Sequence, residues 1–244
     1  MSTKSTLVYL LMLPLVLPGA TQYSVHAQNQ PVNGKISGTI KFEGVAPKVA
    51  PLSISHDRAC QAAHPEPLYS ETGQVNANGT LPNVFIFIKQ GLRENMPVPP
   101  ATPIILDQRG CMFVPHVLGV MVGQPLQILN SDPTTHNVQS AAKENRPHNQ
   151  SQQPGAPPIL WKFNHPEIMI TLKCNVHPWM SAYLGVVDNP FYAVTGKDGV
   201  FSLRGVPPGR YVVEAWTETF GTQEKKVTVP ANRAVTADFM FKLP

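Results

Sequence analysis

Residues 174–180 read "CNVHPWM" and place three potential metal ligands close together. Cys174 offers a thiolate, His177 an imidazole and Met180 a thioether. Thiolate and thioether sulfur favour Cu(I), whereas imidazole also accommodates Cu(II). Zinc would not need the methionine, because structural zinc sites usually close with four strong Cys or His ligands. The spacing therefore predicts a copper site in which the metal changes its oxidation state.

A predicted strand, Glu167–Cys174, leads directly into this loop. Ile170, Leu172 and Cys174 alternate on one face of the strand, so the thiol is expected to point into the apolar core. A tight turn after the cysteine would return the histidine and the methionine of the loop to the same point.

A fourth ligand is expected from about forty residues upstream, in "VGQPLQILNSDPTTHNVQS". There His136 comes just after the predicted strand Leu126–Asn130, with Asp132 and Asn137 beside it. A cysteine and two histidines with a weak, long axial methionine form the ligand set of a blue-copper centre. The alternative, in which the sulfur side chains are core residues and the histidines ordinary buried polar groups, stays open.

Two segments resemble the cupredoxins, the plastocyanin and amicyanin group. "D-x-x-x-H-N-V" is similar to their first-histidine segment, and "C-x-x-H-P-W-M" has the short ligand-loop spacing of amicyanin. The resemblance implies a copper domain over residues 104–190 and one type 1 copper ion. It departs from the family over residues 141–158, which are poor in strand signals, and at Ile170 and Leu172, where the family usually has aromatic residues.

The resemblance also implies roles for individual residues. It makes His136, Cys174, His177 and Met180 the copper ligands. It gives Asn137 the hydrogen bonds that tie the first ligand segment to the cysteine loop and tune the metal. His177, on the loop, is the expected exit for the electron through an apolar surface patch.

The chain as a whole has the pattern of an all-β protein. Its 26 prolines and 17 glycines separate short runs of β-branched and aromatic residues, without helical periodicity. Such spacing is typical of sandwiches or barrels. Residues 43–82 are expected to wrap the core irregularly, and residues 141–158 to form a surface loop. The predicted strands are 35–42, 84–89, 104–106, 117–122, 126–130, 167–174, 184–187, 200–204, 211–217, 222–229 and 234–241.

Residues 191–244 form a segment of different character. The run "T-x-x-D-G-x-F-x-L-x-G-V-P-P-G-x-Y" resembles the small transthyretin-like, carboxypeptidase-regulatory-type β-sandwich modules of exported proteins. The N-terminal β segment, 28–103, opens with "GKISGTIKFEGVAP", which looks like the first strand of such a module. We therefore expect a cupredoxin-like Greek-key sandwich and a small transthyretin-like sandwich. Contacts of Ile36–Phe42 with the C-terminal strands would indicate that both chain ends build the second one.

Three cysteines leave two possibilities open. With Cys174 on the metal, Cys60 and Cys111 are expected to form a disulfide, whose loop of about 50 residues would contribute about 4 kcal/mol. Alternatively, "CQAAH" and "CMFVPH" bring His64 and His116 next to the same cysteines and would supply a second metal site.

The N-terminus predicts export. Residues 1–27 combine Lys4, an apolar run and a small-residue cleavage site, as in a secretory signal peptide, and we expect a periplasmic protein with no membrane segment after its removal. A net charge of +4, or +3 without Lys4, is too small to favour nucleic acid.

The leading hypothesis is an exported blue copper protein that transfers single electrons between redox protein partners, and not an enzyme. Three alternatives are a copper-dependent oxidase or reductase with a second metal site, a copper storage or delivery protein, and a non-metal β-sandwich scaffold.

Overall fold

The structure is a computed structural model that describes residues 33–54, 56–93 and 96–243. The predicted signal peptide, 1–27, lies outside the described residues. The described chain consists of strands joined by turns, with one short helix among them, α1 (Arg58–Ala63). This confirms the predicted all-β class. The described residues contain no helix that is both long and apolar enough to span a membrane.

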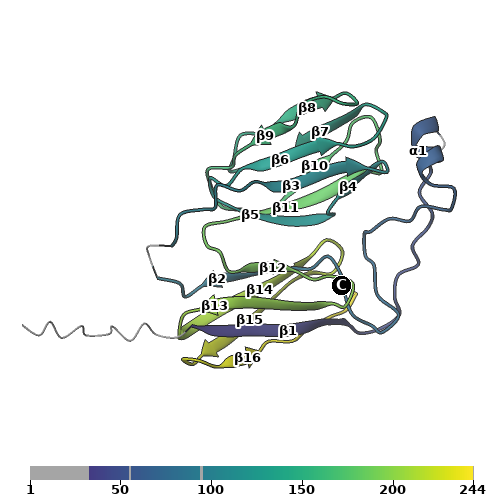
Figure 1. Ribbon diagram of the computed structural model, residues 1–244. Helices are drawn as coiled ribbons and strands as arrows, with labels where there is room; N and C mark the ends of the chain where they lie inside the picture. Colours follow the sequence, from purple (N-terminus) through teal and green to yellow (C-terminus); the bar gives the residue numbers. More distant parts are fainter. Residues whose placement is uncertain (1–32, 55, 94–95, 244) are drawn as a thin grey trace, which may run out of the picture. The chain divides into compact units, whose positions relative to one another are not determined.

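The strands between residues 104 and 187 form one pair of sheets (Figure 1). One sheet has the order β5-β11-β10-β7-β8 and the other β4-β3-β6-β9. The bounds of these strands are β3 (Ile104–Arg109), β4 (Met112–Val114), β5 (Val117–Met121), β6 (Leu126–Asn130), β7 (His136–Ser140), β8 (Asn149–Gln152), β9 (Ile159–Trp161), β10 (Glu167–Lys173) and β11 (Ser181–Val187).

We call this pair of sheets, β3 to β11, the inserted sandwich, and its core lies between the two sheets. Leu106 and Ile128 come from one sheet, Leu172 and Leu184 from the other, and all four are fully buried. Cys174 belongs to the same core cluster, because it continues the inward face of β10. The alternation of apolar residues along β10 thus aims the thiol inward, as the sequence predicts.

The remaining strands form a second pair of sheets, drawn from both ends of the described chain (Figure 1). One sheet has the order β13-β1-β16, with β17 also paired to β1, and the other has the order β12-β2-β14-β15. The bounds are β1 (Gly34–Phe42), β2 (Phe85–Gln90), β12 (Tyr192–Val194), β13 (Val200–Val206), β14 (Gly209–Thr217), β15 (Gly221–Val229), β16 (Ala234–Thr236) and β17 (Phe239–Phe241). We call this the terminal sandwich.

Strand β1 makes the contacts that the N-terminal sequence led us to expect. It pairs antiparallel with β13, with Ile36 opposite Leu203, and parallel with β17, with Ile40 opposite Phe239. All four side chains lie in the second core cluster. The N-terminal segment therefore contributes strands to the same sandwich as the C-terminal segment.

A third apolar cluster joins strands of the two sandwiches. Phe85 on β2 and Tyr192 on β12 pack against the glycines of β5 and β11. A Cβ atom at Gly119 would lie 2.5 Å from the Tyr192 ring, and one at Gly185 would lie 2.5 Å from the Phe85 ring. Glycine is required at both positions because no side chain fits beneath the two rings.

The structure differs from the predicted strands mainly between residues 136 and 161. His136 follows β6, as predicted, but it also begins a strand that was not predicted, β7, and the expected loop 141–158 contains β8. Most side chains of β8 are polar and exposed, since β8 is the edge strand of its sheet. It therefore lacks the apolar alternation by which strands are recognised. The short strands β4, β9 and β12 were also missed, and β11 begins three residues earlier than predicted.

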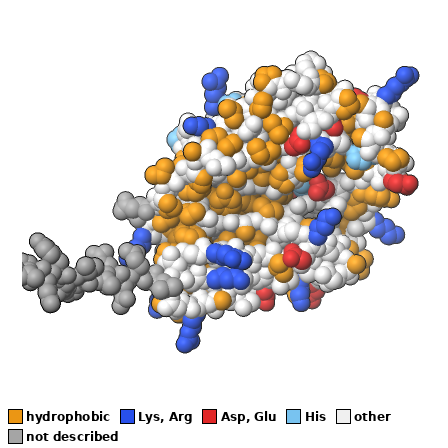
Figure 2. Space-filling model, viewed as in Figure 1, with side chains coloured by type: hydrophobic (Ala, Val, Ile, Leu, Met, Phe, Trp, Pro, Cys, Tyr) orange, Lys and Arg blue, Asp and Glu red, His pale blue; other side chains and the backbone are white. Residues whose placement is uncertain are grey.

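Charged side chains of both signs are scattered over the face of the protein that Figure 2 shows, around a broad band of hydrophobic side chains. Lysines and arginines therefore form no continuous basic stripe on that face.

Candidate metal centre

The ligand loop is closed by its own backbone. The Cys174 N–H donates to the Met180 carbonyl at 3.3 Å, and the Met180 N–H donates to the His177 carbonyl at 2.9 Å. These bonds bring the two ends of the loop together between β10 and β11. Met180 is fully buried and belongs to the same core cluster as Cys174.

His136 reaches this loop from the neighbouring strand. Strand β7 pairs with β10, with Ser140 opposite Leu172. The Nδ1 atom of His136 lies 2.9 Å from Nδ1 of His177, and the Cys174 sulfur lies 3.9 Å from that same His177 nitrogen. The ligand atoms of the three side chains all lie within 4.8 Å of one another, and the three residues are buried. The structure thus brings together three of the four predicted ligand side chains, with Met180 at the end of the same loop.

The sulfur of Cys174 is set up as a thiolate. Burial alone would raise the pKa of the thiol, but the neighbouring His136 and backbone N–H groups outweigh it and lower the pKa to about 6. The N–H groups of Asn137 and His177 both donate to the sulfur at 3.4 Å. The thiolate is the form that binds a metal.

Asn137 ties the two ligand segments together. Its side-chain oxygen accepts a hydrogen bond from the Asn175 N–H at 3.3 Å, and its side-chain nitrogen donates to Asn149 on β8 at 2.8 Å. These hydrogen bonds hold the start of β7 against the cysteine loop, as the resemblance implies.

Asp132 fixes the far side of the His136 ring. Its carboxylate accepts hydrogen bonds from the N–H groups of Gly110 and Cys111, at 2.6 and 2.7 Å, and lies 2.8 Å from Nε2 of His136. Burial disfavours the charged form of each side chain. The hydrogen bond and the attraction between the two charges outweigh burial, so the pKa of His136 rises to about 9 and that of Asp132 falls. With Nε2 held by Asp132, the ring presents Nδ1 to the other ligands.

Asp57 makes the corresponding contact with His177. Its Oδ2 atom lies 3.3 Å from Nε2 of that histidine and also accepts a hydrogen bond from the Thr134 hydroxyl at 2.9 Å. Burial would raise the pKa of this carboxyl, but the hydrogen bonds from Cys60, Thr134, His177 and Ala59 lower it to about 2. Asp57 is therefore an anion beside the second predicted histidine ligand.

Asp57 is a functional candidate that the sequence prediction missed. It caps α1, and the pattern of Asp before "RACQAA" is a helix-start signal that could have been recognised. Its approach to His177 could not, because 120 positions separate the two residues.

The structure corrects the expected exposure of His177. This residue is only 2% exposed, so its ring presents no surface patch to a partner. Asp57 lies on one side of the ring, and the Trp179 ring lies 5.0 Å from it, centroid to centroid.

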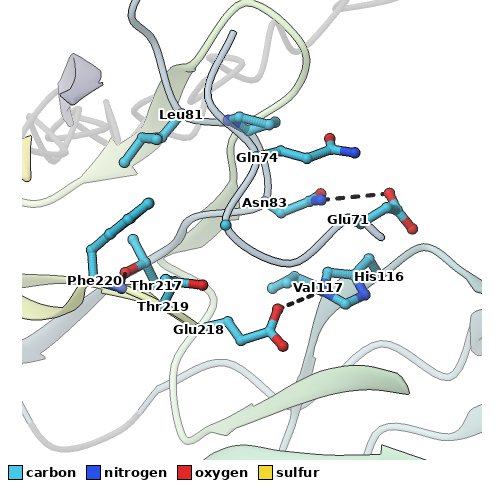
Figure 3. A pocket seen from close by; sticks show the side chains of 12 residues that line it. Glu71, Gln74, Leu81, Asn83, His116, Val117, Thr217, Glu218, Thr219 and Phe220 are labelled. Carbon is cyan, nitrogen blue, oxygen red and sulfur yellow. Dashed lines mark hydrogen bonds and ion pairs between the residues drawn. The ribbon is translucent and has the colours of Figure 1, made fainter. Parts of the chain in front are cut away.

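Cys60 and Cys111 form the disulfide that the sequence predicts. The alternative second metal site with His64 and His116 does not form around these cysteines. His64 Nε2 lies 2.6 Å from the Gly110 carbonyl oxygen, and His116 Nε2 lies 2.9 Å from a carboxylate oxygen of Glu218. Figure 3 shows His116 facing Glu218 at the edge of a small cavity.

One family model matches the C-terminal part of the chain. Residues 184–242 match the carboxypeptidase regulatory-like domain family, beginning seven residues before the predicted module boundary at 191. No curated protein sequence shows significant similarity to the chain.

Similar solved structures include an amicyanin, a purple cupredoxin and a copper-containing nitrite reductase. A mutant of amicyanin in its Cu(I) form is 19% identical, with a TM-score of 0.30, over 34% of this chain and 81% of that one. A purple cupredoxin from Nitrosopumilus maritimus is 20% identical, with a TM-score of 0.29, over 34% of this chain and 97% of that one. A copper-containing nitrite reductase from Thermus scotoductus SA-01 is 18% identical, with a TM-score of 0.33, over 40% of this chain. The match spans only 25% of the reductase chain.

Proposed function

We propose that the protein is an exported, periplasmic type 1 copper protein that carries single electrons between redox protein partners. The proposed ligands of its one copper ion are His136, Cys174, His177 and Met180. Residues 104–190 would form the copper domain, inserted into a sandwich built from residues 28–103 and 191–244. The Cys60–Cys111 disulfide supports an oxidising compartment.

One observation carries the proposal: a buried thiolate and two imidazoles whose Nδ1 atoms face each other. Burying an ionised thiol and two polar rings in an apolar core costs free energy unless they bind something or satisfy one another. The donor set fits copper, because thiolate, thioether and imidazole suit its two oxidation states. When bound, copper would supply a one-electron couple.

The chain's own residues would keep the site rigid while its charge changes. Asn137 and the backbone N–H of His177 hold the cysteine sulfur in place. Asp132 holds the His136 ring by its Nε2 atom. Because the surrounding strands already fix these groups, little would have to move when the site gains or loses an electron, and electron transfer would be fast.

The visible spectrum of the protein with added Cu(II) tests the proposal. We expect an intense blue absorption band from sulfur-to-copper charge transfer, at one copper per chain. Cys174→Ser should abolish the band, because a hydroxyl cannot replace the thiolate. A colourless wild-type protein, or a Cys174→Ser variant that keeps the colour, would contradict the proposal.

A copper oxidase or reductase is the alternative function. Such an enzyme needs a second, open metal position for its substrate. Within the described residues, the groups of potential ligands that lie close together all share members of this one cluster. A measured stoichiometry of two coppers per chain would instead favour the enzyme.

A further inference from the structure

The segment around α1 lies directly against the second predicted histidine ligand. This segment, residues 57–64, precedes the inserted sandwich in the sequence, and its only helix has six residues. The disulfide attaches Cys60 to Cys111, whose N–H also donates to Asp132. Because His64 contacts the Gly110 carbonyl as well, the segment is fixed to the β3–β4 turn at two points. We call this segment the cap.

The two oxygens of Asp57 have separate tasks. Oδ1 accepts hydrogen bonds from the N–H groups of Ala59 and Cys60, at 2.7 and 3.0 Å, and so caps α1. Oδ2 faces away from the helix, toward the Thr134 hydroxyl and Nε2 of His177. Helix capping needs only one of these oxygens. The second oxygen is therefore available for the histidine.

We propose that the cap covers His177 and that Asp57 is a positioning residue for this ligand. The Nε2–H of the imidazole donates to the carboxylate, which leaves Nδ1 unprotonated and directed at Cys174 and His136. This inference rests on the proposed copper-binding function. The cap, and not a strand of the inserted sandwich, would hold Nε2 of His177.

The carboxylate acts on the ring in two ways. First, the 3.3 Å contact is at the long end of the hydrogen-bond range, so it chiefly fixes the tautomer and the orientation of the ring. Second, a full negative charge beside a ligand ring favours the more positively charged metal state. Asp57 should therefore lower the reduction potential and slow the loss of the metal.

The cap also changes where a partner meets the site. His177 is buried beneath Asp57 and next to Trp179, so a partner touches the cap instead of the histidine. Trp179 is half-buried, and its indole N–H donates to the Cys111 carbonyl at 3.0 Å. The indole therefore links the ligand loop to the turn that carries the disulfide.

Two substitutions separate positioning from helix capping. Asp57→Asn and Asp57→Ser both keep an oxygen that caps α1, but neither keeps the negative charge beside the ring. Glu66→Gln is the matched control, since it removes an exposed carboxylate from the same part of the chain. In the copper-loaded protein we expect both Asp57 variants to have a higher reduction potential. We also expect them to release copper to a chelator about 10 to 100 times faster, and the control to match the wild type.

A measurement without metal keeps the two proposals apart. Nitrogen-15 NMR of the imidazole rings in the metal-free protein should find His177 protonated at Nε2 in the wild type and the control, with that preference lost in Asp57→Asn. A blue wild type whose potential, copper release and ring spectrum are unchanged in Asp57→Asn would overturn the role of Asp57 but leave the copper function standing. A wild type that binds no copper would overturn the copper function, and the ring spectrum alone would then decide whether Asp57 holds His177.

Discussion

The two sandwiches have similar cores but bury different kinds of polar group. In the inserted sandwich, Asp132, His136 and His177 are buried at one end and converge with Cys174. In the terminal sandwich, the buried Thr80 hydroxyl donates to the Asn78 side chain, and the buried Thr195 hydroxyl accepts from the Val84 N–H. Glu214 pairs with a lysine at the surface. Both sandwiches have strands with alternating apolar residues, whereas the convergence of buried titratable groups distinguishes the sandwich that contains the proposed copper site.

The largest effect is expected from a substitution in the terminal core, which should lower stability without removing the proposed copper site. Leu203 is 1% exposed in the terminal core, and Leu203→Ala should lower the free energy of unfolding by about 3 kcal/mol through lost burial and a residual cavity. The copper spectrum of the folded variant should stay unchanged. Urea unfolding and the visible spectrum measure the two effects.

Cys174→Ser is the opposite case, because it removes the spectrum with little change in the terminal core. If Leu203→Ala also removed the spectrum from protein that is still folded, the two sandwiches would not be separable in function.

The sequence predicted the strands whose apolar residues alternate, and it missed short or polar strands and contacts between remote residues. Strands β1, β10 and β13 were identified because the apolar residues of each strand alternate and face the core of its own sandwich. The ligand loop was identified because its chemistry is local in sequence. Asp57 was missed as a neighbour of His177, since the contact depends on where a disulfide holds an irregular segment. No local pattern records such a contact.

The buried ion pair between the sandwiches should make stability depend on pH. Burial disfavours charge on His116 and on Glu218, but their mutual hydrogen bond outweighs it, raising the pKa of His116 above 6.5 and lowering that of Glu218 below 4.5. His116 contributes fully to the free energy of unfolding below the pKa that it has in the unfolded chain. This contribution is lost as the pH rises through the pKa of His116 in the folded protein. Glu218 contributes to the free energy of unfolding above the pKa that it has in the unfolded chain. This contribution is lost as the pH falls through the pKa of Glu218 in the folded protein. The pair is therefore most stabilising between about pH 4.5 and 6.5.

Glu218→Gln tests this pair. Removing one partner of a buried, hydrogen-bonded charge pair should cost about 2 kcal/mol near pH 5.5. The difference from the wild type should shrink at alkaline pH, where His116 is neutral. Urea unfolding across this pH range measures it, and a difference that stays constant with pH would mean that the two groups are not coupled. Tyr183→Phe is a useful comparison, because it removes another hydrogen bond to Glu218 without changing any charge on this pair.

The smallest effect is expected from the surface charges of the terminal sandwich. Lys89 lies 2.7 Å from Glu214, whose side chain is 9% exposed, and 2.6 Å from Glu224, but its own side chain is 39% exposed and that of Glu224 is 50% exposed. Water and salt screen such pairs, so Lys89→Met should cost less than about 1 kcal/mol, and the cost should fall at high salt. Urea unfolding at low and high ionic strength measures it. A salt-independent loss of several kcal/mol would mean that this cluster behaves like the buried charges of the inserted sandwich, and the distinction between the two sandwiches would no longer hold.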